Sequence, residues 1–362
     1  MTPGPVNVAD YERLAGDLLE EGPLGYFAGG AGDERTLREN VAAYARHALR
    51  PRVLVDVSGV STATTVLGTE IAMPLIVAPV ALQRMAHPGG ECAMARAAAA
   101  AGTIMTVSTI ATTAPREVAE AAPGAPRWFQ VYVFKDRGVT RHMIDQAIDC
   151  GYSALVLTVD APRAGRRERD FRSDFSVPEG IDMPAVTEAV GGTAGITPQQ
   201  FFSLVDPSLT WGDLEHLVAD SPVPVVLKGV QTGADARLAA EHGAAGIVVS
   251  NHGGRQLDTV AATIDLLPEC VEAVDERIEV FVDGGVRRGT DVLVALALGA
   301  RAVLVGRPAL WGLTVDGEAG ARHVLELMRD EIELGLVLLG APGPGAVRRD
   351  HVSGQAPGRG GR

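Results

Sequence analysis

Cysteine is scarce in this chain of 362 residues, and its few positions exclude two kinds of structural support. The three cysteines, Cys92, Cys150 and Cys270, are widely spaced and form no CxxC pair. An odd number of isolated cysteines is not the pattern of a disulfide framework or of a zinc site. We therefore predict no metal and no disulfide. A hydrophobic content of 46% is enough to build a large core instead.

Long apolar runs and an excess of basic charge are also missing. No stretch approaches the roughly 18 consecutive apolar residues of a transmembrane helix, and residues 1–4 lack the charged and apolar regions of a signal peptide. The net charge of −13 argues against a surface for nucleic acids or anionic membranes, which needs a basic patch. We expect a cytoplasmic protein with small-molecule partners, and neither nucleic acid nor membrane among them.

Lysine is nearly absent. Of the 32 basic residues, only Lys135 and Lys228 are lysines. Wherever a generic positive charge is enough, this chain uses arginine. Lys228 follows an apolar run in a predicted strand, so we expect its compact ammonium group to have a function that a broad guanidinium would not fulfil.

Eight short apolar runs, most of them about 25 residues apart, dominate the middle of the chain. Segments rich in helix formers separate them, as expected for parallel strands joined by crossover helices. A doubly wound sheet rarely has eight such units, so we predict an α/β fold, a (β/α)8 TIM barrel. The runs are Ile76–Val80, Ile104–Ser108, Trp128–Val133, Leu155–Asp160, Pro224–Val230, Gly246–His252, Val280–Gly285 and Ala302–Gly306.

The length fits one domain over residues 1–362, with the barrel at about 74–340 and helices within residues 10–45. A gap of about 60 residues follows the fourth strand. Within it, residues 171–207 are rich in Gly, Pro, Ser and Thr and show no sustained apolar stripe, which indicates a partly mobile lid over the barrel mouth. The Gly-rich and Pro-rich tail, residues 341–362, is predicted to be flexible.

Polar residues recur where the predicted strands end. Alternation along each strand directs Gln130 and Tyr132, Thr158 and Asp160, and Lys228 into the barrel. A buried polar group without a partner costs about 1 to 3 kcal/mol, so this set implies a polar guest.

A phosphate group is predicted after the last two strands. Asp283, Gly284, Gly285 and Arg287 follow the seventh strand, and Gly306-Arg307 ends the eighth. Backbone amides and guanidinium groups at this place form the usual phosphate site of barrels, which indicates a phosphorylated cofactor.

The stretch Ser250–Asp258 combines a base with a fixed cation. Alternation puts Ser250 and His252 on one strand face, and a turn with two glycines returns Arg255 to the same mouth. Histidine accepts a proton near neutral pH, and arginine grips a carboxylate with two hydrogen bonds. A structural ion pair at a strand end remains the alternative for an isolated His and Arg.

The whole stretch Ser250–Asp258, together with Tyr26–Asp33, resembles the FMN-dependent α-hydroxy acid oxidases and dehydrogenases, and the resemblance extends from about Tyr11 to Gly340. It implies FMN as the cofactor. The positions that match the family's FMN contacts are Pro79, Val80, Ala81, Ser108, Gln130, Thr158, Lys228, Ser250, Asp283, Gly284, Gly285, Arg287, Gly306 and Arg307.

The resemblance also implies roles around the substrate. His252 takes a proton and Asp160 stabilises its charged form, while Lys228 lies beside the flavin. Arg255, Arg167 and Tyr26 hold the carboxylate, although composition alone makes Tyr26 a packing aromatic. Tyr132 contacts the α-hydroxyl or keto oxygen, and Ile110 stands where glycolate oxidases carry tryptophan, so a wider apolar pocket is expected.

The resemblance implies oxidation of an (S)-2-hydroxy acid to the 2-keto acid, with O2 reduced to H2O2, in a tetramer or octamer. Transfer of the α-hydrogen as proton or as hydride stays open. Within the family the chain resembles the 4-hydroxymandelate oxidases, which favours mandelate or 4-hydroxymandelate. The alternatives are a mandelate or lactate dehydrogenase with another acceptor, an FMN-type isopentenyl diphosphate isomerase, and a catalytically silent flavin-binding module.

Overall fold

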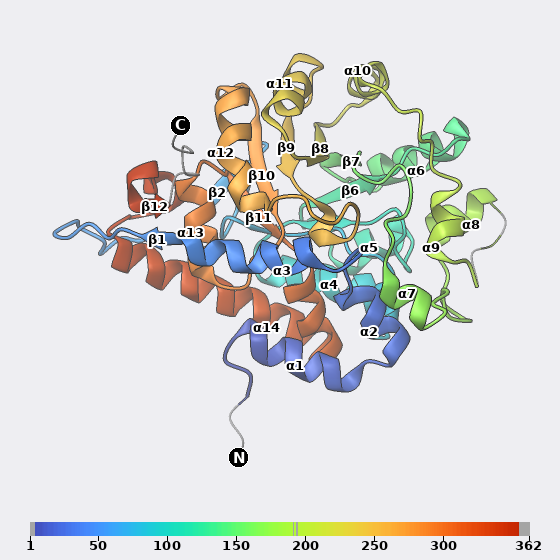
Figure 1. Cartoon of the computed structure of the whole chain (residues 1–362), viewed down its shortest axis with the longest axis horizontal. Helices are drawn as coiled ribbons and strands as arrows, with labels where there is room; N and C mark the ends of the chain where they lie inside the picture. Colours follow the sequence, from blue (N-terminus) through green and yellow to red (C-terminus); the bar gives the residue numbers. More distant parts are fainter. Residues whose placement is uncertain (1–3, 191, 193–194, 355–362) are drawn as a thin grey trace.

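Eight parallel strands close into a barrel at the centre of the molecule (Figure 1). The structure is a computed structural model that describes residues 4–190, 192 and 195–354. Each predicted apolar run overlaps one barrel strand, so the predicted (β/α)8 TIM barrel is confirmed. The strands are β4 (Leu75–Val77), β5 (Met105–Val107), β6 (Arg127–Val131), β7 (Ala154–Thr158), β8 (Val225–Val230), β9 (Gly246–Val249), β10 (Glu279–Asp283) and β11 (Ala302–Val305).

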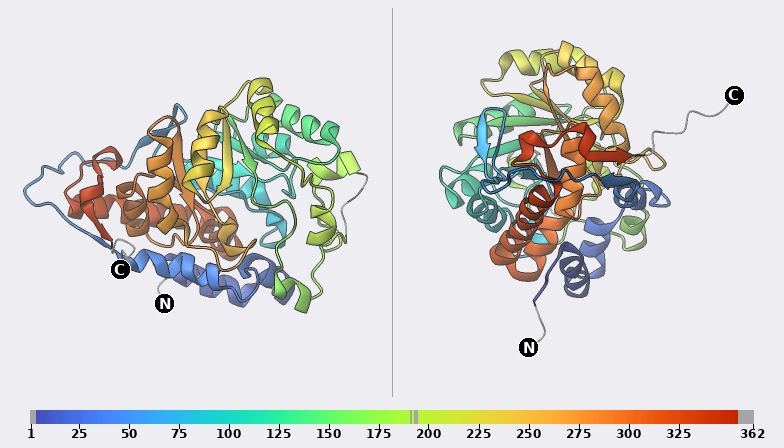
Figure 2. Two further views of the ribbon diagram at one scale, coloured as in Figure 1. Left: turned by 45° about the horizontal axis from the view of Figure 1, so that its top comes forward. Right: turned by 90° about the vertical axis from the view of Figure 1, so that its left-hand side faces the viewer.

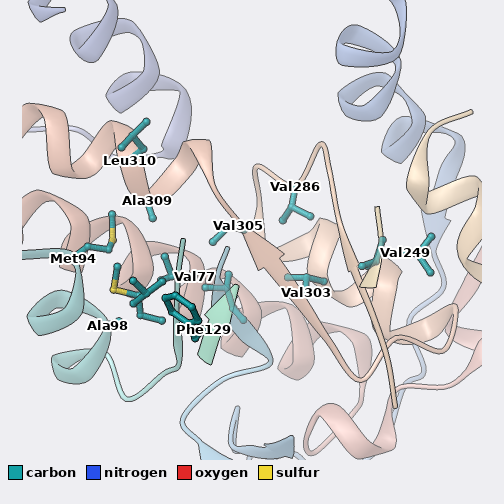
Figure 3. Packing of buried hydrophobic residues seen from close by; sticks show 14 of the residues in the cluster. Val77, Met94, Ala98, Phe129, Val249, Val286, Val303, Val305, Ala309 and Leu310 are labelled. Atoms are coloured by element: carbon teal, nitrogen blue, oxygen red, sulfur yellow. The ribbon is translucent and has the colours of Figure 1, made fainter. Parts of the chain in front are cut away.

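Helices surround this barrel and cover the outward side chains of its strands. Figure 3 shows Val77 and Phe129 of the strands packed near Met94 and Ala98 of α4. The same cluster includes Leu310, at the start of the last helix. The outer helices are α4 (Gly90–Ala100), α5 (Pro115–Ala121), α6 (Arg137–Asp149), α10 (Trp211–Asp220), α11 (Gly233–Glu241), α12 (Thr263–Val274), α13 (Gly289–Ala297) and α14 (Arg307–Leu339).

The barrel interior is apolar in its lower half, toward the amino ends of the strands. Trp128 and Phe281 meet edge to face at 5.5 Å between ring centroids, and Val156 and Val226 belong to the same buried cluster. The hairpin of β2 (Thr64–Val66) and β3 (Thr69–Ile71) adds buried side chains to it. Because side chains alternate along a strand, Gln130, Thr158 and Lys228, two residues further on, face the same interior one layer higher.

Three N-terminal helices line one side of the molecule (Figure 2). They are α1 (Val8–Leu18), α2 (Glu21–Ala28) and α3 (Arg35–Ala42), with Gly29, Gly30 and Gly32 between α2 and α3. The Tyr11 hydroxyl lies 2.8 Å from His323 Nδ1, which ties α1 to α14. The short 3-10 turn η1 (Ala43–Arg46) leads from α3 into β1 (His47–Leu49).

The lid between β7 and β8 contains α7 (Glu168–Arg172), α8 (Pro184–Val190) and α9 (Pro198–Phe202). It shows no sustained apolar stripe, as expected from its sequence, yet it contains buried apolar side chains. Phe175, Val177, Met183, Phe201 and Phe202 are all buried. These side chains are spread over irregular backbone as well as short helices, so no helical or strand period reveals them. No helix in the described part of the chain is long and apolar enough to cross a membrane.

The prediction of a flexible tail from residue 341 was wrong up to residue 354. Ala341, Val347 and Val352 are buried, and β12 (Val352–Gly354) pairs antiparallel with β1. The 3-10 turns η4 (Pro344–Ala346) and η5 (Arg349–His351) lie between α14 and β12. The glycines and prolines serve these turns. Residues 355–362 lie outside the described residues.

Helix α14 bends sharply at Asp316 and Gly317, which have non-helical backbone angles. The bend brings Gly312 against Gly320, where a Cβ on Gly320 would lie 2.1 Å from the Gly312 carbonyl oxygen. Gly320→Ala is therefore expected to lower the free energy of unfolding by at least about 2 kcal/mol, through forced backbone movement. Denaturant unfolding measures this effect.

The matched control for this prediction is Gly16→Ala, because a Cβ at Gly16 in α1 meets no heavy atom within 4 Å. That change should stabilise the helix by up to about 1 kcal/mol. Equal effects of the two substitutions would contradict the close packing of the two glycines.

Candidate active site

A deep cavity opens at the carboxyl ends of the barrel strands. The empty space inside it is about 1270 Å³, counting the part open to solvent. Of the predicted site residues only Asp160 and Ser250 do not line it. The predicted residues that do are Tyr26, Pro79, Val80, Ala81, Ser108, Ile110, Gln130, Tyr132, Thr158, Arg167, Lys228, His252, Arg255, Asp283, Gly284, Gly285, Arg287, Gly306 and Arg307.

His252 reaches the cavity by a route that strand alternation did not predict. β9 ends at Val249, and His252 opens the 3-10 turn η3 (His252–Gly254) with a left-handed φ of 58°. Its backbone N–H donates to Ser250 Oγ at 3.1 Å. A non-glycine residue in this conformation costs energy, so the surrounding contacts hold it there. The expected position at the mouth is therefore found, but a strained turn provides it.

His252 and Asp160 form a buried hydrogen-bonded pair. His252 Nδ1 lies 2.9 Å from Asp160 Oδ1. The His252 and Lys228 charges outweigh burial and hold the pKa of Asp160 below its usual range, so this carboxylate only accepts. Nδ1 therefore carries the proton and Nε2 keeps a free lone pair. Burial also lowers the pKa of His252, more than Asp160 raises it, which keeps the ring neutral and able to accept a proton.

Lys228 is enclosed by acceptors at the ends of β9 and β10. Its Nζ donates to Ser250 Oγ at 2.9 Å and lies 3.1 Å from Asp283 Oδ2. Burial alone would lower the pKa of Lys228, but Asp283 and Asp160 raise it above the usual value. The side chain is thus a charged ammonium inside the barrel, and Ser250 serves to orient it from behind.

The predicted phosphate end lies between β10, β11 and the first turn of α14. Gly284 and Gly285 have φ of 94° and 84°, and a Cβ on Gly285 would lie 1.9 Å from the Asn40 carbonyl oxygen, so only glycine fits there. Arg307 donates to the carbonyl oxygens of Phe27, Gly29 and Gly253. Burial, with Arg255 and Arg287 nearby, lowers the pKa of Arg307 to about 9.

A second cluster of positive charge faces the cavity from Arg167 and Arg255. Arg255 donates to the Tyr26 and Gly29 carbonyl oxygens, and Arg167 Nε donates to the Arg255 carbonyl oxygen at 3.3 Å. Burial and then the charge of Arg167 lower the pKa of Arg255 to about 10. The Tyr26 ring lies under the Arg255 guanidinium, 4.9 Å from its centroid. The guanidinium groups of Arg167 and Arg255 repel each other, so an anion that binds both of them is favoured here.

The apolar wall of the cavity comes from the lid and was not predicted from the sequence. Met183, Phe201 and Phe202 line the cavity together with the predicted Ile110. The Phe202 ring meets the Tyr132 ring edge to face at 5.4 Å. The adjacent pair Phe201-Phe202, which follows the capping box of Thr197 and Gln200, was the sequence signal for this wall. Two large aromatic side chains in a row are unusual in a solvated loop and indicate burial.

Comparison with known sequences identifies the family. The sequence profile of the FMN-dependent dehydrogenases matches residues 15–354. The chain belongs to this family. An L-lactate oxidase of Nostoc sp. is 49% identical over 346 residues, 93% of this chain and 94% of that protein. Glycolate oxidase 3 of Arabidopsis thaliana is 49% identical over 355 residues, 96% of this chain and 95% of that protein.

Solved structures of mandelate oxidase have the same fold. The structure with (S)-4-hydroxymandelic acid superposes with a TM-score of 0.90, at 43% identity, covering 96% of this chain and 98% of that one. The mutant structure with (S)-mandelic acid has a TM-score of 0.87 at 42% identity, covering 96% of this chain and 98% of that one. These relatives therefore span almost the whole chain.

The family's FMN cofactor fits polar atoms that otherwise lack partners. Among the described residues, Gln130 Nε2, Thr158 Oγ1 and Asp283 Oδ1 are buried without a hydrogen bond. They come from three strands and meet at the cavity beside the Lys228 ammonium. A flavin ring system offers both acceptors and donors that could pair with these atoms, and the glycines and arginines after β10 and β11 would hold its phosphate. The residues present therefore suit FMN.

Proposed function

We propose that this FMN-dependent enzyme oxidises an aromatic (S)-2-hydroxy acid to the 2-keto acid, with oxygen as the electron acceptor. The observation that carries the proposal is the convergence of the His252–Asp160 pair and the Arg167–Arg255 pair on one cavity. A base beside a carboxylate-binding cation matches a 2-hydroxy acid, whose carboxylate and reacting carbon are adjacent. The relatives named as lactate, glycolate and mandelate oxidases support this class.

The side chains divide the work between binding and proton transfer. Arg167 and Arg255 hold the carboxylate, with the Tyr26 hydroxyl assisting, and fix the α-carbon beside His252. His252 Nε2 accepts the substrate proton, and the Asp160 carboxylate stabilises the imidazolium that forms. Burial strongly raises the pKa of Tyr132, which therefore stays protonated and can donate a hydrogen bond to the α-oxygen.

FMN supplies the two-electron acceptor for this oxidation. In the proposed site Gln130, Thr158 and Asp283 would hold its polar ring edge, and Gly285, with the amides at the start of α14, would hold its phosphate. The Lys228 ammonium places a fixed positive charge at that edge, and Ser250 and Asp283 keep it in place. A compact ammonium suits this narrow position better than a guanidinium.

The aromatic substrate class is supported by the apolar wall of the cavity. Ile110, Met183, Phe201 and Phe202 offer apolar area near the reacting groups. Burying an aromatic ring there gains roughly 25 cal/mol for each Å² removed from water. Glycolate has no side chain that could use this wall. Sequence identity does not decide between substrates, since lactate and glycolate oxidases are at least as similar to this chain as the mandelate oxidase structures.

Anaerobic mixing with mandelate tests the proposed class directly. The flavin absorption near about 450 nm should disappear as the substrate is oxidised. An isopentenyl diphosphate isomerase or a silent flavin-binding module would keep this absorption. Persistence of the yellow colour with mandelate, 4-hydroxymandelate, lactate and glycolate would therefore refute the proposal.

The first functional prediction concerns the base. Only neutral His252 accepts a proton, and its pKa lies below the usual 6.5. The rate of flavin reduction should therefore be flat from about pH 7 to 8 and should fall only as pH drops through a value below 6.5. His252→Asn should lower the rate by at least about 10² and remove this acid limb. Stopped-flow absorbance measures both, and an unchanged profile in the variant would contradict the assignment.

The second functional prediction concerns the acceptor. Ala81 stands where, by resemblance, dehydrogenases that avoid oxygen tend to carry glycine. We expect one hydrogen peroxide for each keto acid formed in air, measured with a peroxidase-coupled assay. Turnover that needs an artificial acceptor and forms no peroxide would assign the enzyme to the dehydrogenases.

The third functional prediction concerns substrate size. The kcat/KM for mandelate or 4-hydroxymandelate should exceed that for glycolate or lactate by at least about tenfold, which requires about 1.4 kcal/mol of differential binding. Ile110→Trp should erode this preference by filling the apolar space, while Ile110→Leu, of equal volume, should keep it. Steady-state kinetics with the four acids measures the effect. Better turnover of glycolate by the unmodified enzyme would mean that the pocket is not selective.

A further inference from the structure

Asp170 is a buried carboxylate for which the proposed reaction has no role. It lies on α7 at the base of the lid and is only 4% exposed. Neither of its carboxylate oxygens has a hydrogen-bond partner among the described residues. A buried carboxylate without donors is costly, so an electrostatic interaction has to offset its burial.

The charges that face Asp170 are the two arginines of the proposed carboxylate site. Asp170 Oδ2 lies 4.0 Å from Arg167 Nη1, and both side chains are almost completely buried. Burial raises the pKa of Asp170, and Arg255 and Arg167 oppose this rise only in part. Asp170 does not line the cavity, whereas Arg167 and Arg255 do. The carboxylate therefore acts on the arginine pair from outside the cavity that a substrate would enter.

We propose that Asp170 is a positioning residue that offsets part of the charge of the Arg167–Arg255 pair and thereby limits how tightly the site holds carboxylates. The inference rests on the proposed function. With Asp170 ionised, the pair has a net charge of one, which a single substrate carboxylate neutralises. Without it, two cations would face one carboxylate, and the keto acid product, like the substrate, would be held more tightly.

The charge effect predicts a gain in affinity, whereas a merely structural role predicts a loss. In Asp170→Asn the shape is kept and the charge is removed. Binding of glyoxylate, pyruvate and benzoylformate should tighten by at least about fivefold, because an opposing charge close behind the arginines is gone. Binding of neutral mandelamide should change by less than about twofold, because it carries no charge. Titration of the flavin absorbance of the oxidised holoenzyme measures each dissociation constant.

Kinetics provides a second readout. Tighter product binding should lower kcat, while the rate of flavin reduction by saturating mandelate stays within about threefold of the unmodified enzyme. The matched control is Asp174→Asn, which removes the same charge at an exposed position of the same segment. Its affinities for the three keto acids should equal those of the unmodified enzyme.

Each remaining outcome decides the question. Unchanged or weaker keto acid binding in Asp170→Asn would overturn the inference and leave the proposed function standing. If no keto acid binds the unmodified enzyme, the proposed function fails as well. Asp170→Ser removes the charge with a smaller side chain. If neither variant folds with FMN bound, Asp170 supports the lid structurally, and the charge-balancing role is wrong.

Discussion

The barrel mouth concentrates positive charge in a chain whose net charge is negative, and the site depends on this concentration. The protein as a whole carries a net charge of −13, yet Arg167, Arg255 and Arg307 face one cavity, and the pKa of Arg255 and that of Arg307 are depressed there. Such cations remain in place because carbonyl oxygens bind their N–H groups. Under the proposed function, a cofactor phosphate at one end of the cavity and a substrate carboxylate at the other complete the balance.

The fold makes this concentration of charge possible by separating two layers of the barrel. Trp128, Phe281 and their neighbours fill the lower interior and form a rigid apolar base. Two residues further along the same strands, and on the same face, lie Gln130, Thr158 and Lys228, which line the cavity. The rigid base fixes these side chains to strands rather than loops, which keeps them oriented before any guest arrives. The strained turn at His252 adds the base at the edge of this layer.

Sequence periodicity predicted those parts that follow a regular backbone. The eight β-branched runs and the polar residues two positions beyond their apolar neighbours were readable because strand alternation is strict. The position of His252 was right, but its left-handed φ was not predictable from alternation. The burial of Val347 and Val352 was hidden among glycines and prolines that indicated disorder. Asp170 lies in a charged run after Arg166, a composition that usually marks an exposed surface.

The lid combines two properties that composition alone does not reveal together. Its many Gly, Pro, Ser and Thr residues suit a segment that bends repeatedly, while Phe175, Met183 and Phe202 place apolar area over the mouth. Phe175 stacks on Tyr26, at 4.8 Å between ring centroids, so lid packing reaches the tyrosine beside the arginine pair. Because Asp170 lies on α7, next to residues 171–207, this part of the chain supplies both the apolar wall and, in the proposed role of Asp170, a countercharge. Changes in the lid are therefore expected to alter affinity and selectivity together, whereas the strands determine the chemistry.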